Sequence, residues 1–278
     1  MPIEAILFDL DNTLLLEDDA TEDALRRTSE LAARRTGGAA GSIHAAAREA
    51  AESLFAASPH FAYSEAMGIW WGEALWGDFA GDREEIAALR AFVPGFRHAV
   101  WRRALRGVDG DALVDDVAAA FRDIRRALRP IDPEAEATLA DVGRDHRLAL
   151  VTNGAPDVQR EKLATTTLAA HFAAIVISVE LGIGKPDPRI FRAAIDAIGV
   201  GPEAAVMVGD SLERDIAGAR RAGLRGVWLD RAGDGKSDGA GDGKSDGAIV
   251  PNARIGTLGE LRSTLTALER ADPFPQPA

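Results

Sequence analysis

Residues 3–13 read IEAILFDLDNT, an apolar run that ends in two aspartates. From Ile3 to Phe8 the side chains are apolar except for Glu4, and polar turn-forming residues follow at once. A short apolar run bounded in this way is typical of a strand that is buried on both faces of a sheet. We therefore expect the first strand here, with Asp9 at its carboxyl end.

Further apolar runs, each followed by polar residues, recur along the chain. The clearest are residues 148–151 and 205–208, and weaker ones are residues 175–177 and 226–229. Helix-like segments lie between them at residues 157–165, 188–198 and 213–222. This alternation predicts an α/β fold, a doubly wound parallel sheet of Rossmann-like type with helices on both faces. Ligands of such sheets bind beyond the carboxyl ends of the strands.

The segment from about residue 20 to residue 128 has a different pattern. Ala, Arg, Glu and Leu recur in it at helical spacing, and few runs in it could be strands. Because it leaves after the first strand and returns before the second, it predicts an inserted helical cap domain on a discontinuous core. We expect the α/β catalytic core to comprise residues 1–17 and 129–278, and the cap residues 18–128.

Composition limits the possible partners and surroundings of the chain. The net charge is −12, and no cluster of Lys and Arg offers a stripe for a phosphate backbone, so we expect no nucleic-acid partner. The absence of cysteine excludes disulfides and thiolate metal sites. No uninterrupted apolar stretch approaches the ~20 residues of a membrane span, and the N-terminus does not read as a signal peptide. We expect a cytoplasmic monomer or small homo-oligomer that does not bind a membrane.

The first polar motif is Asp9-Leu10-Asp11-Asn12-Thr13, at the predicted end of the first strand. It could be an ordinary Asx turn, or the start of a calcium loop. A calcium loop needs glycine at its sixth position and glutamate at its twelfth, where this chain has Leu14 and Ala20. Two carboxylates two positions apart on one turn can also share a catalytic site in different roles. We take Asp9 as a candidate nucleophile toward phosphorus, with Asp11 handling protons.

Two further motifs supply groups suited to a phosphoryl oxygen. Residues 151–154 read VTNG, and Thr152 offers a hydroxyl group where a strand should turn into a helix. Residues 184–188 read GKPDP, where two prolines present Lys185 just before a helix. Each of these could be a plain loop, but a fixed ammonium group is also what a transferring phosphoryl group requires.

The fourth motif, GDSLERD at residues 209–215, follows an apolar run and opens a helix. Asp210 or Ser211 could simply cap that helix. Mg²⁺ is usually held by one or two carboxylates with water and substrate phosphate, so Asp9 and Asp210 are candidate ligands. Because all four motifs come near the carboxyl ends of predicted strands, they are expected to converge on one site.

The four motifs FDLDNT, VTNG, GKPDP and GDSLERD, in this order, resemble those of the haloacid dehalogenase superfamily. The position of the helical insert resembles the subgroup with a helical (C1) cap. Within that subgroup, VTNGAPDVQREKL and VMVGDSLERDIAGARRAGL are similar to N-acylneuraminate-9-phosphatase-like members. The resemblance implies that Asp9 is the nucleophile and Asp11 the acid/base, and that Thr152, Asn153 and Lys185 bind the phosphate. It also implies that Mg²⁺ is held by Asp9, the backbone carbonyl of Asp11, and Asp210. Asp215 would then order metal-bound water or Lys185.

Together these features predict a Mg²⁺-dependent phosphomonoester hydrolase. Its substrate is expected to be a small phosphorylated metabolite, a sugar phosphate or a nucleotide, and its intermediate an aspartyl-phosphate. Asp11 argues against dehalogenation, because dehalogenases of the superfamily lack the second aspartate. A phosphomutase and a non-catalytic phosphate-binding protein remain as alternatives. The duplicated GDGKSDGA at residues 233–240 and 241–248 is expected to be a loop with no assigned chemistry.

Overall fold

In the computed structural model, strand β1 (Ala5–Phe8) lies inside a parallel sheet whose order is β3-β2-β1-β4-β5-β6. The other strands found among the described residues are β2 (Arg147–Thr152), β3 (Ala174–Ile177), β4 (Ala205–Gly209), β5 (Arg225–Leu229) and β6 (Ala253–Ile255). The chain adds β2 and β3 on one side of β1 and then β4, β5 and β6 on the other. The strand order therefore reverses beside β1, which is where sheets of this kind bind ligands.

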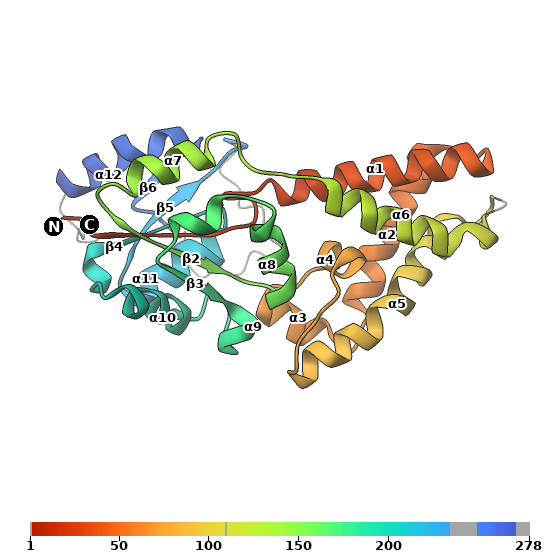
Figure 1. Cartoon of the computed structure of the whole chain (residues 1–278), viewed down its shortest axis with the longest axis horizontal. Coiled ribbons are helices and arrows are strands. Elements are labelled where there is room, and N and C mark those ends of the chain that lie inside the picture. The colour runs from red at the N-terminus through yellow and green to blue at the C-terminus, as the bar shows by residue number, and fades with distance from the viewer. Residues whose placement is uncertain (1, 109, 234–248, 271–278) are drawn as a thin grey trace. The chain divides into compact units, whose positions relative to one another are not determined.

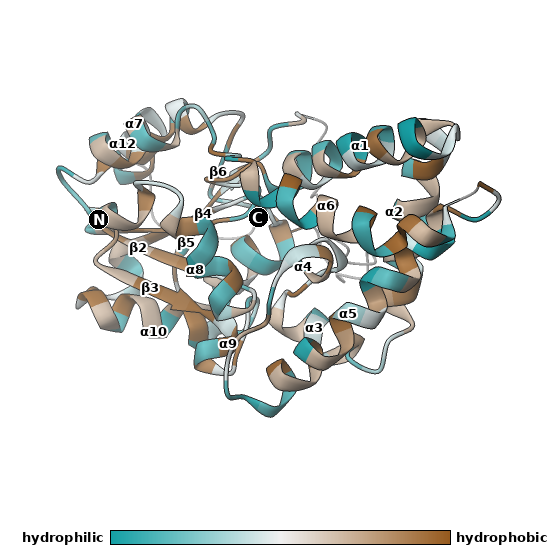
Figure 2. Cartoon of the chain, turned by 45° about the vertical axis from the view of Figure 1, so that its right-hand side comes forward, coloured by the Kyte–Doolittle hydropathy of each residue, from teal (hydrophilic) through white to brown (hydrophobic). Residues whose placement is uncertain are grey.

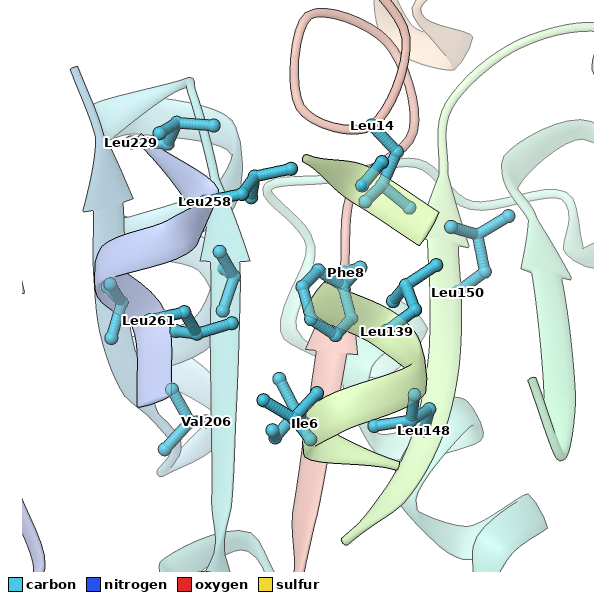
Figure 3. Close-up of a cluster of buried hydrophobic side chains, with 14 of the residues drawn as sticks. Ile6, Phe8, Leu14, Leu139, Leu148, Leu150, Val206, Leu229, Leu258 and Leu261 are labelled. Atoms are coloured by element: carbon cyan, nitrogen blue, oxygen red, sulfur yellow. The ribbon is translucent and has the colours of Figure 1, made fainter. Parts of the chain in front are cut away.

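Both faces of the sheet are apolar, as the sequence of the first strand predicts. Ile6 and Phe8 point into one cluster of buried side chains, which Figure 3 shows with Leu139 and Leu261. Alternate residues of the same strand, such as Leu7, belong to a second buried cluster. A strand buried on both faces in this way has no side that could face water.

Helices cover both faces of this sheet, which confirms the predicted doubly wound α/β fold. Figure 1 shows α7 (Ala135–Val142) and α12 (Leu261–Arg270) on one face, and α10 (Pro188–Ile198) and α11 (Gly218–Ala222) on the other. In Figure 2, strands β2 and β3 are mostly brown, the colour of hydrophobic residues. The short helix α9 is Ser178–Leu181, and 3-10 turns lie at Asp111–Leu113, Leu168–His171, Pro202–Ala204 and Leu258–Glu260.

The helix predicted at residues 213–222 differs from the expectation in its first half. Leu212–Ala217 is π-helical, and only the following turn is α11. The Ser211 side chain caps this segment by accepting a hydrogen bond from the Arg214 backbone N–H at 3.2 Å. Segments of π-helix occur often at functional sites, and this one carries Asp215.

The residues from Glu17 to Ala127 are mainly helical, as the pattern of residues 20–128 predicts. Their helices are α1 (Glu17–Thr36), α2 (Ala40–Ala56), α3 (Phe61–Met67), α4 (Trp71–Trp76), α5 (Glu84–Ala104) and α6 (Val114–Ala127). Helix α1 packs against α2 and α6, and α2 packs against α5. Helix α8 (Pro156–Ala164) follows β2.

The chain divides into two compact units. The core unit is Met1–Leu16, Ile131–Asn153 and Leu163–Ala278, and the helical unit is Glu17–Pro130 with Gly154–Lys162. The helical unit thus includes most of α8, whereas the sequence-based expectation placed all of residues 129–278 in the core.

Buried ion pairs account for the place of α8 in the helical unit. Lys162 of α8 donates from Nζ to Glu73 Oε1 at 2.8 Å, and Nζ lies 3.7 Å from Glu17 Oε2. Glu17 also pairs with Arg125, near the end of α6. Since each of these four side chains is less than 5% exposed, α8 is bound to the helical unit by charges that have little access to water.

The structure describes residues 2–108, 110–233 and 249–270. All but the first residue of the duplicated GDGKSDGA segment lies outside these ranges, so its expected loop is not part of the description. Within the same ranges, no helix is both long and apolar enough to cross a membrane.

Candidate active site

Strands β1, β2 and β4 end at one edge of the sheet, and each end carries a residue of a predicted motif. Asp9 follows β1, Thr152 is the last residue of β2, and Asp210 follows β4. The Asp9 backbone N–H still donates to the Val208 carbonyl at 3.0 Å, so the position of Asp9 is fixed by the sheet itself. The parallel arrangement therefore brings together segments that are distant in sequence.

Lys185 lies between two of the predicted acids. Its Nζ is 2.5 Å from Asp9 Oδ1 and 2.6 Å from Asp215 Oδ1, and its side chain is 3% exposed. Burial alone would lower the pKa of Lys185, but the charges of Asp215 and Asp9 raise it above its ordinary value. The ammonium group consequently stays charged inside the site.

The Asp9 carboxylate is held through both of its oxygens. Oδ1 accepts from Lys185, and Oδ2 accepts from the Thr13 hydroxyl at 3.3 Å. Burial raises the pKa of Asp9 to about 6; Lys185 opposes this shift, whereas the carboxylates of Asp215 and Asp11 add to it. Asp9 is thus an oriented carboxylate that is ionised near neutral pH.

Asp210 and Asp215 complete a cluster of acids with Asp9. Each of the three offers a carboxylate oxygen, and these oxygens lie within 4.8 Å of one another. Burial raises the pKa of Asp210 well above its usual range, and the charges of Asp9 and Asp215 add to this. Carboxylates crowded in this way favour a bound cation.

The position of Asp215 depends on a close backbone approach. Its Oδ2 accepts from the Ser211 backbone N–H at 3.0 Å, while its Oδ1 accepts from Lys185. A Cβ atom built on Gly209 would lie 2.2 Å from Asp215 Oδ2. Only glycine therefore leaves room for this carboxylate beneath the end of β4.

The Asn153 side chain forms two hydrogen bonds with the backbone of Lys185. Its Nδ2 donates to the Lys185 carbonyl at 3.0 Å, and its Oδ1 accepts from the Lys185 N–H at 2.8 Å. These bonds join the end of β2 to the loop that carries the lysine. The neighbouring Thr152 hydroxyl donates to the Asn153 carbonyl at 3.3 Å.

Asp11 sits on a tight turn that follows the first strand. The backbone N–H groups of Leu14 and Leu15 both donate to the Leu10 carbonyl at 2.9 Å, and Asn12 has a φ of 58°. Asp11 is half-buried and close enough to Asp9 to raise its pKa. The two carboxylates are thus neighbours in different surroundings.

Sequence reasoning missed two residues near the end of β5. Trp228 donates from Nε1 to the Asp210 carbonyl at 2.7 Å, and Arg231 donates to the Thr13 carbonyl at 2.6 Å. No motif marks either of them. Their one signal in the sequence is that they stand at the end of a predicted strand, at the same edge as the four motifs.

The donor set of this site fits Mg²⁺. The clustered ligand atoms are all carboxylate oxygens, the donors that Mg²⁺ prefers. Asp9, Asp210 and Asp215 are therefore the side chains that could hold the ion.

Comparison with known proteins gives a family model and several close relatives. The model of the haloacid dehalogenase-like hydrolases matches residues 3–223. A phosphoserine phosphatase of Thermus thermophilus is 43% identical over 232 residues, which is 82% of this chain and 89% of that protein. An N-acylneuraminate-9-phosphatase of Rattus norvegicus is 34% identical over 142 residues, which is 49% of this chain and 57% of that protein.

Solved structures share the fold. The HAD-hydrolase YfnB from Bacillus subtilis, bound to magnesium, has a TM-score of 0.62 at 22% identity, covering 96% of this chain and 100% of that one. A 2-haloacid dehalogenase from Pseudomonas syringae has a TM-score of 0.54 at 29% identity, covering 95% and 99%.

Proposed function

Because the chain belongs to the haloacid dehalogenase-like hydrolase family, we propose that it is a Mg²⁺-dependent phosphatase of small phosphorylated metabolites. The observation that carries this proposal is the Asp9 carboxylate, held between Lys185 and Thr13 beside Asp210. We propose that the core unit is catalytic and that the helical unit is the inserted cap.

In the first half-reaction, an Asp9 oxygen forms a bond to phosphorus while the bond from phosphorus to the substrate's oxygen breaks. Asp11 donates its proton to that leaving oxygen, which departs as an alcohol. In the second half-reaction, Asp11 takes a proton from water as the water oxygen attacks phosphorus. The aspartyl-phosphate is cleaved, inorganic phosphate is released, and both carboxyl groups return to their starting states.

The groups around Asp9 stabilise the phosphoryl group as its charge redistributes. The ammonium of Lys185 is buried and charged, so it interacts strongly with phosphoryl oxygens. Thr152 adds a hydroxyl at the end of β2. Asn153 acts through Lys185, because its amide holds the lysine backbone at both the N–H and the carbonyl.

Asp9, Asp210 and the backbone carbonyl of Asp11 would hold Mg²⁺. The bound ion would supply positive charge to the phosphoryl oxygens and screen the repulsion between Asp9 and the incoming phosphate. Asp215 would keep Lys185 and the turn at Ser211 in place, through one hydrogen bond from each.

Phosphoserine is the first substrate to test. A relative that covers 82% of this chain is named a phosphoserine phosphatase, whereas others are named for N-acylneuraminate 9-phosphate and glyceraldehyde 3-phosphate. All three are small phosphate monoesters. N-acylneuraminate 9-phosphate and glyceraldehyde 3-phosphate are sugar phosphates, a class predicted from the sequence, whereas phosphoserine is neither a sugar phosphate nor a nucleotide.

A phosphate-release screen tests the proposal. The panel contains phosphoserine, glyceraldehyde 3-phosphate, N-acylneuraminate 9-phosphate, a hexose 1-phosphate and a nucleotide, each with Mg²⁺ and with a chelator. We expect Mg²⁺-dependent release that is abolished in Asp9→Asn and retained in Asp196→Asn, a matched change on the exposed side of α10. Full activity of Asp9→Asn would refute the mechanism, and conversion of hexose 1-phosphate without phosphate release would favour a mutase.

A further inference from the structure

The side chain of Arg231, two residues after β5, reaches the turn that follows β1. One guanidinium nitrogen donates to the Thr13 carbonyl at 2.6 Å, and another lies 3.0 Å from Asp132 Oδ2. The Arg231 side chain is 27% exposed and that of Asp132 is 7% exposed. All three residues belong to the core unit.

Asp132 fixes the same turn from a second direction. Its backbone N–H donates to the Leu14 carbonyl at 3.0 Å, and its Oδ1 accepts from the Glu134 N–H at 2.8 Å. The consecutive carbonyls of Thr13 and Leu14 are therefore held by Arg231 and by Asp132, which also hold each other. These contacts fix the backbone of the last part of the turn, at Thr13 and Leu14.

Thr13 connects these contacts to the reacting groups. While its carbonyl accepts from Arg231, its hydroxyl donates to Asp9 Oδ2 at 3.3 Å, and it is fully buried. Asp11 lies two residues before it in the same turn. A shift of the Thr13 backbone would therefore move both the acid/base and a hydrogen-bond donor to the nucleophile.

We propose that Arg231 is a positioning residue, which holds the turn so that Asp11 can reach the leaving oxygen of the substrate. The inference rests on the role of Asp11 in the proposed function. Displacement of a reacting group by about 1 Å can lower a rate by about 100-fold, so a contact outside the reacting atoms can control the chemical step. Arg231 itself touches no reacting atom.

This role has a kinetic signature that general loss of structure does not share. An alkyl phosphate such as phosphoserine releases an alkoxide unless Asp11 protonates the leaving oxygen. p-Nitrophenyl phosphate releases a stable phenolate and needs little protonation. Hydrolysis of the aspartyl-phosphate is the same step for both substrates, so the comparison uses release of the leaving group in a single turnover, which reports the first half-reaction alone. For Arg231→Met we expect the rate of this release to fall about 10- to 100-fold with the alkyl phosphate and less than about threefold with p-nitrophenyl phosphate.

The experiment compares these two substrates across four variants, with phosphoserine or the best alkyl phosphate of the screen. Asp11→Asn is the reference for loss of the acid, and Arg221→Met, at an exposed position of α11, is the matched control. Arg231→Lys keeps the charge with a single donor group and should recover part of the alkyl activity. If the thermal transition shows that Arg231→Met does not fold, Arg231→Lys and Asp132→Asn are compared on the two substrates instead.

The outcomes separate this inference from the function on which it rests. Selective loss of alkyl activity in both Asp11→Asn and Arg231→Met supports it. A second outcome is that Asp11→Asn selectively loses alkyl activity, while Arg231→Met loses activity equally on both substrates or on neither. This outcome overturns the role of Arg231 alone. Equal effects of Asp11→Asn on the rates of leaving-group release from both substrates overturn the assignment of Asp11 as the acid, and the inference with it.

Discussion

Lys185 donates from Nζ to Asp215 Oδ1 at 2.6 Å, in a salt bridge whose side chains are 3% and 1% exposed. The same ammonium group reaches Asp9, so one buried cation serves two buried carboxylates. Removing one partner of a buried ion pair leaves a charge without compensation. Lys185 therefore compensates two buried charges and also orients the proposed nucleophile, Asp9.

Lys185→Met should lower the free energy of unfolding by about 3–5 kcal/mol at about pH 8, because both acids lose their cation. The contribution of Asp9 to this loss of stability should be smaller at about pH 5. Burial already raises the pKa of Asp9 to about 6, so Asp9 takes up a proton there. Urea denaturation at the two pH values measures both effects. Arg221→Met is the control, and equal stability of wild type and Lys185→Met at the higher pH would contradict the assignment.

The affinity for Mg²⁺ should fall as the pH drops through about 6. Burial, with the neighbouring carboxylates, raises the pKa of Asp9 to about 6 and that of Asp210 above its usual range, so the metal must displace protons. The affinity should change by up to about tenfold per pH unit for each proton displaced. Titration calorimetry in buffers of different ionisation enthalpy measures both quantities, and an affinity independent of pH would argue against these two ligands.

The stability of the metal-free protein should fall as the pH rises, whereas the affinity for Mg²⁺ should rise. Because the pKa of Asp9 is raised on folding, its contribution to stability is complete below its ordinary value of 3.8 and is lost as the pH rises through about 6. Asp9→Asn should therefore reduce the pH dependence of the thermal midpoint between about pH 4 and about pH 7 in the presence of a chelator. A midpoint that follows the wild-type curve throughout would show that another group is responsible.

Trp228→Phe should weaken Mg²⁺ binding more than it weakens the fold. The indole donates to the Asp210 carbonyl at 2.7 Å, and its loss frees the turn that aims the Asp210 carboxylate. Outer contacts of this kind are worth about 10- to 100-fold in metal affinity. The upward shift of the thermal midpoint with added Mg²⁺ measures the effect; Trp71→Phe, a half-buried tryptophan of the helical unit, should keep the full shift.

Gly209→Ala should abolish most activity, whereas Gly41→Ala should not. A Cβ atom at Gly209 would lie 2.2 Å from Asp215 Oδ2, so Asp215 and its hydrogen bond to Lys185 must move. A Cβ atom at Gly41 meets nothing within 4 Å, and in helix α2 alanine should add about 0.5–1 kcal/mol of stability. Parallel measurements of turnover and of the thermal midpoint distinguish the two glycines.

Much of the core was predictable because a buried parallel strand has a distinctive sequence. Five runs were predicted as strands and all five are strands, and the predicted superfamily is confirmed by the match to its model. Strand β6 was missed because Ala253–Ile255 is short and carries Arg254. Neither Trp228 nor Arg231 was predicted, since each donates to a backbone carbonyl of another segment, and such contacts depend on tertiary structure alone.

Asn153 and α8 show a second limit of prediction from the sequence. The residue type of Asn153 suits a phosphate oxygen and a backbone amide equally well, and only its two bonds to Lys185 distinguish them. Helix α8 follows a core strand directly, so sequence order places it in the core. Its partners Glu17 and Glu73 are more than 85 residues away, and their pairing with Lys162 cannot be read from any local pattern.

The membership of α8 in the helical unit also limits how this protein can be recombined with its relatives. A chimera that exchanges only residues 17–130 would receive Glu17 and Glu73 from one parent and Lys162 from the other. Unless both parents carry this ion pair, the hybrid would contain buried charges without partners. The exchangeable module is therefore discontinuous, residues 17–130 together with 154–162, and its second piece begins directly after Asn153.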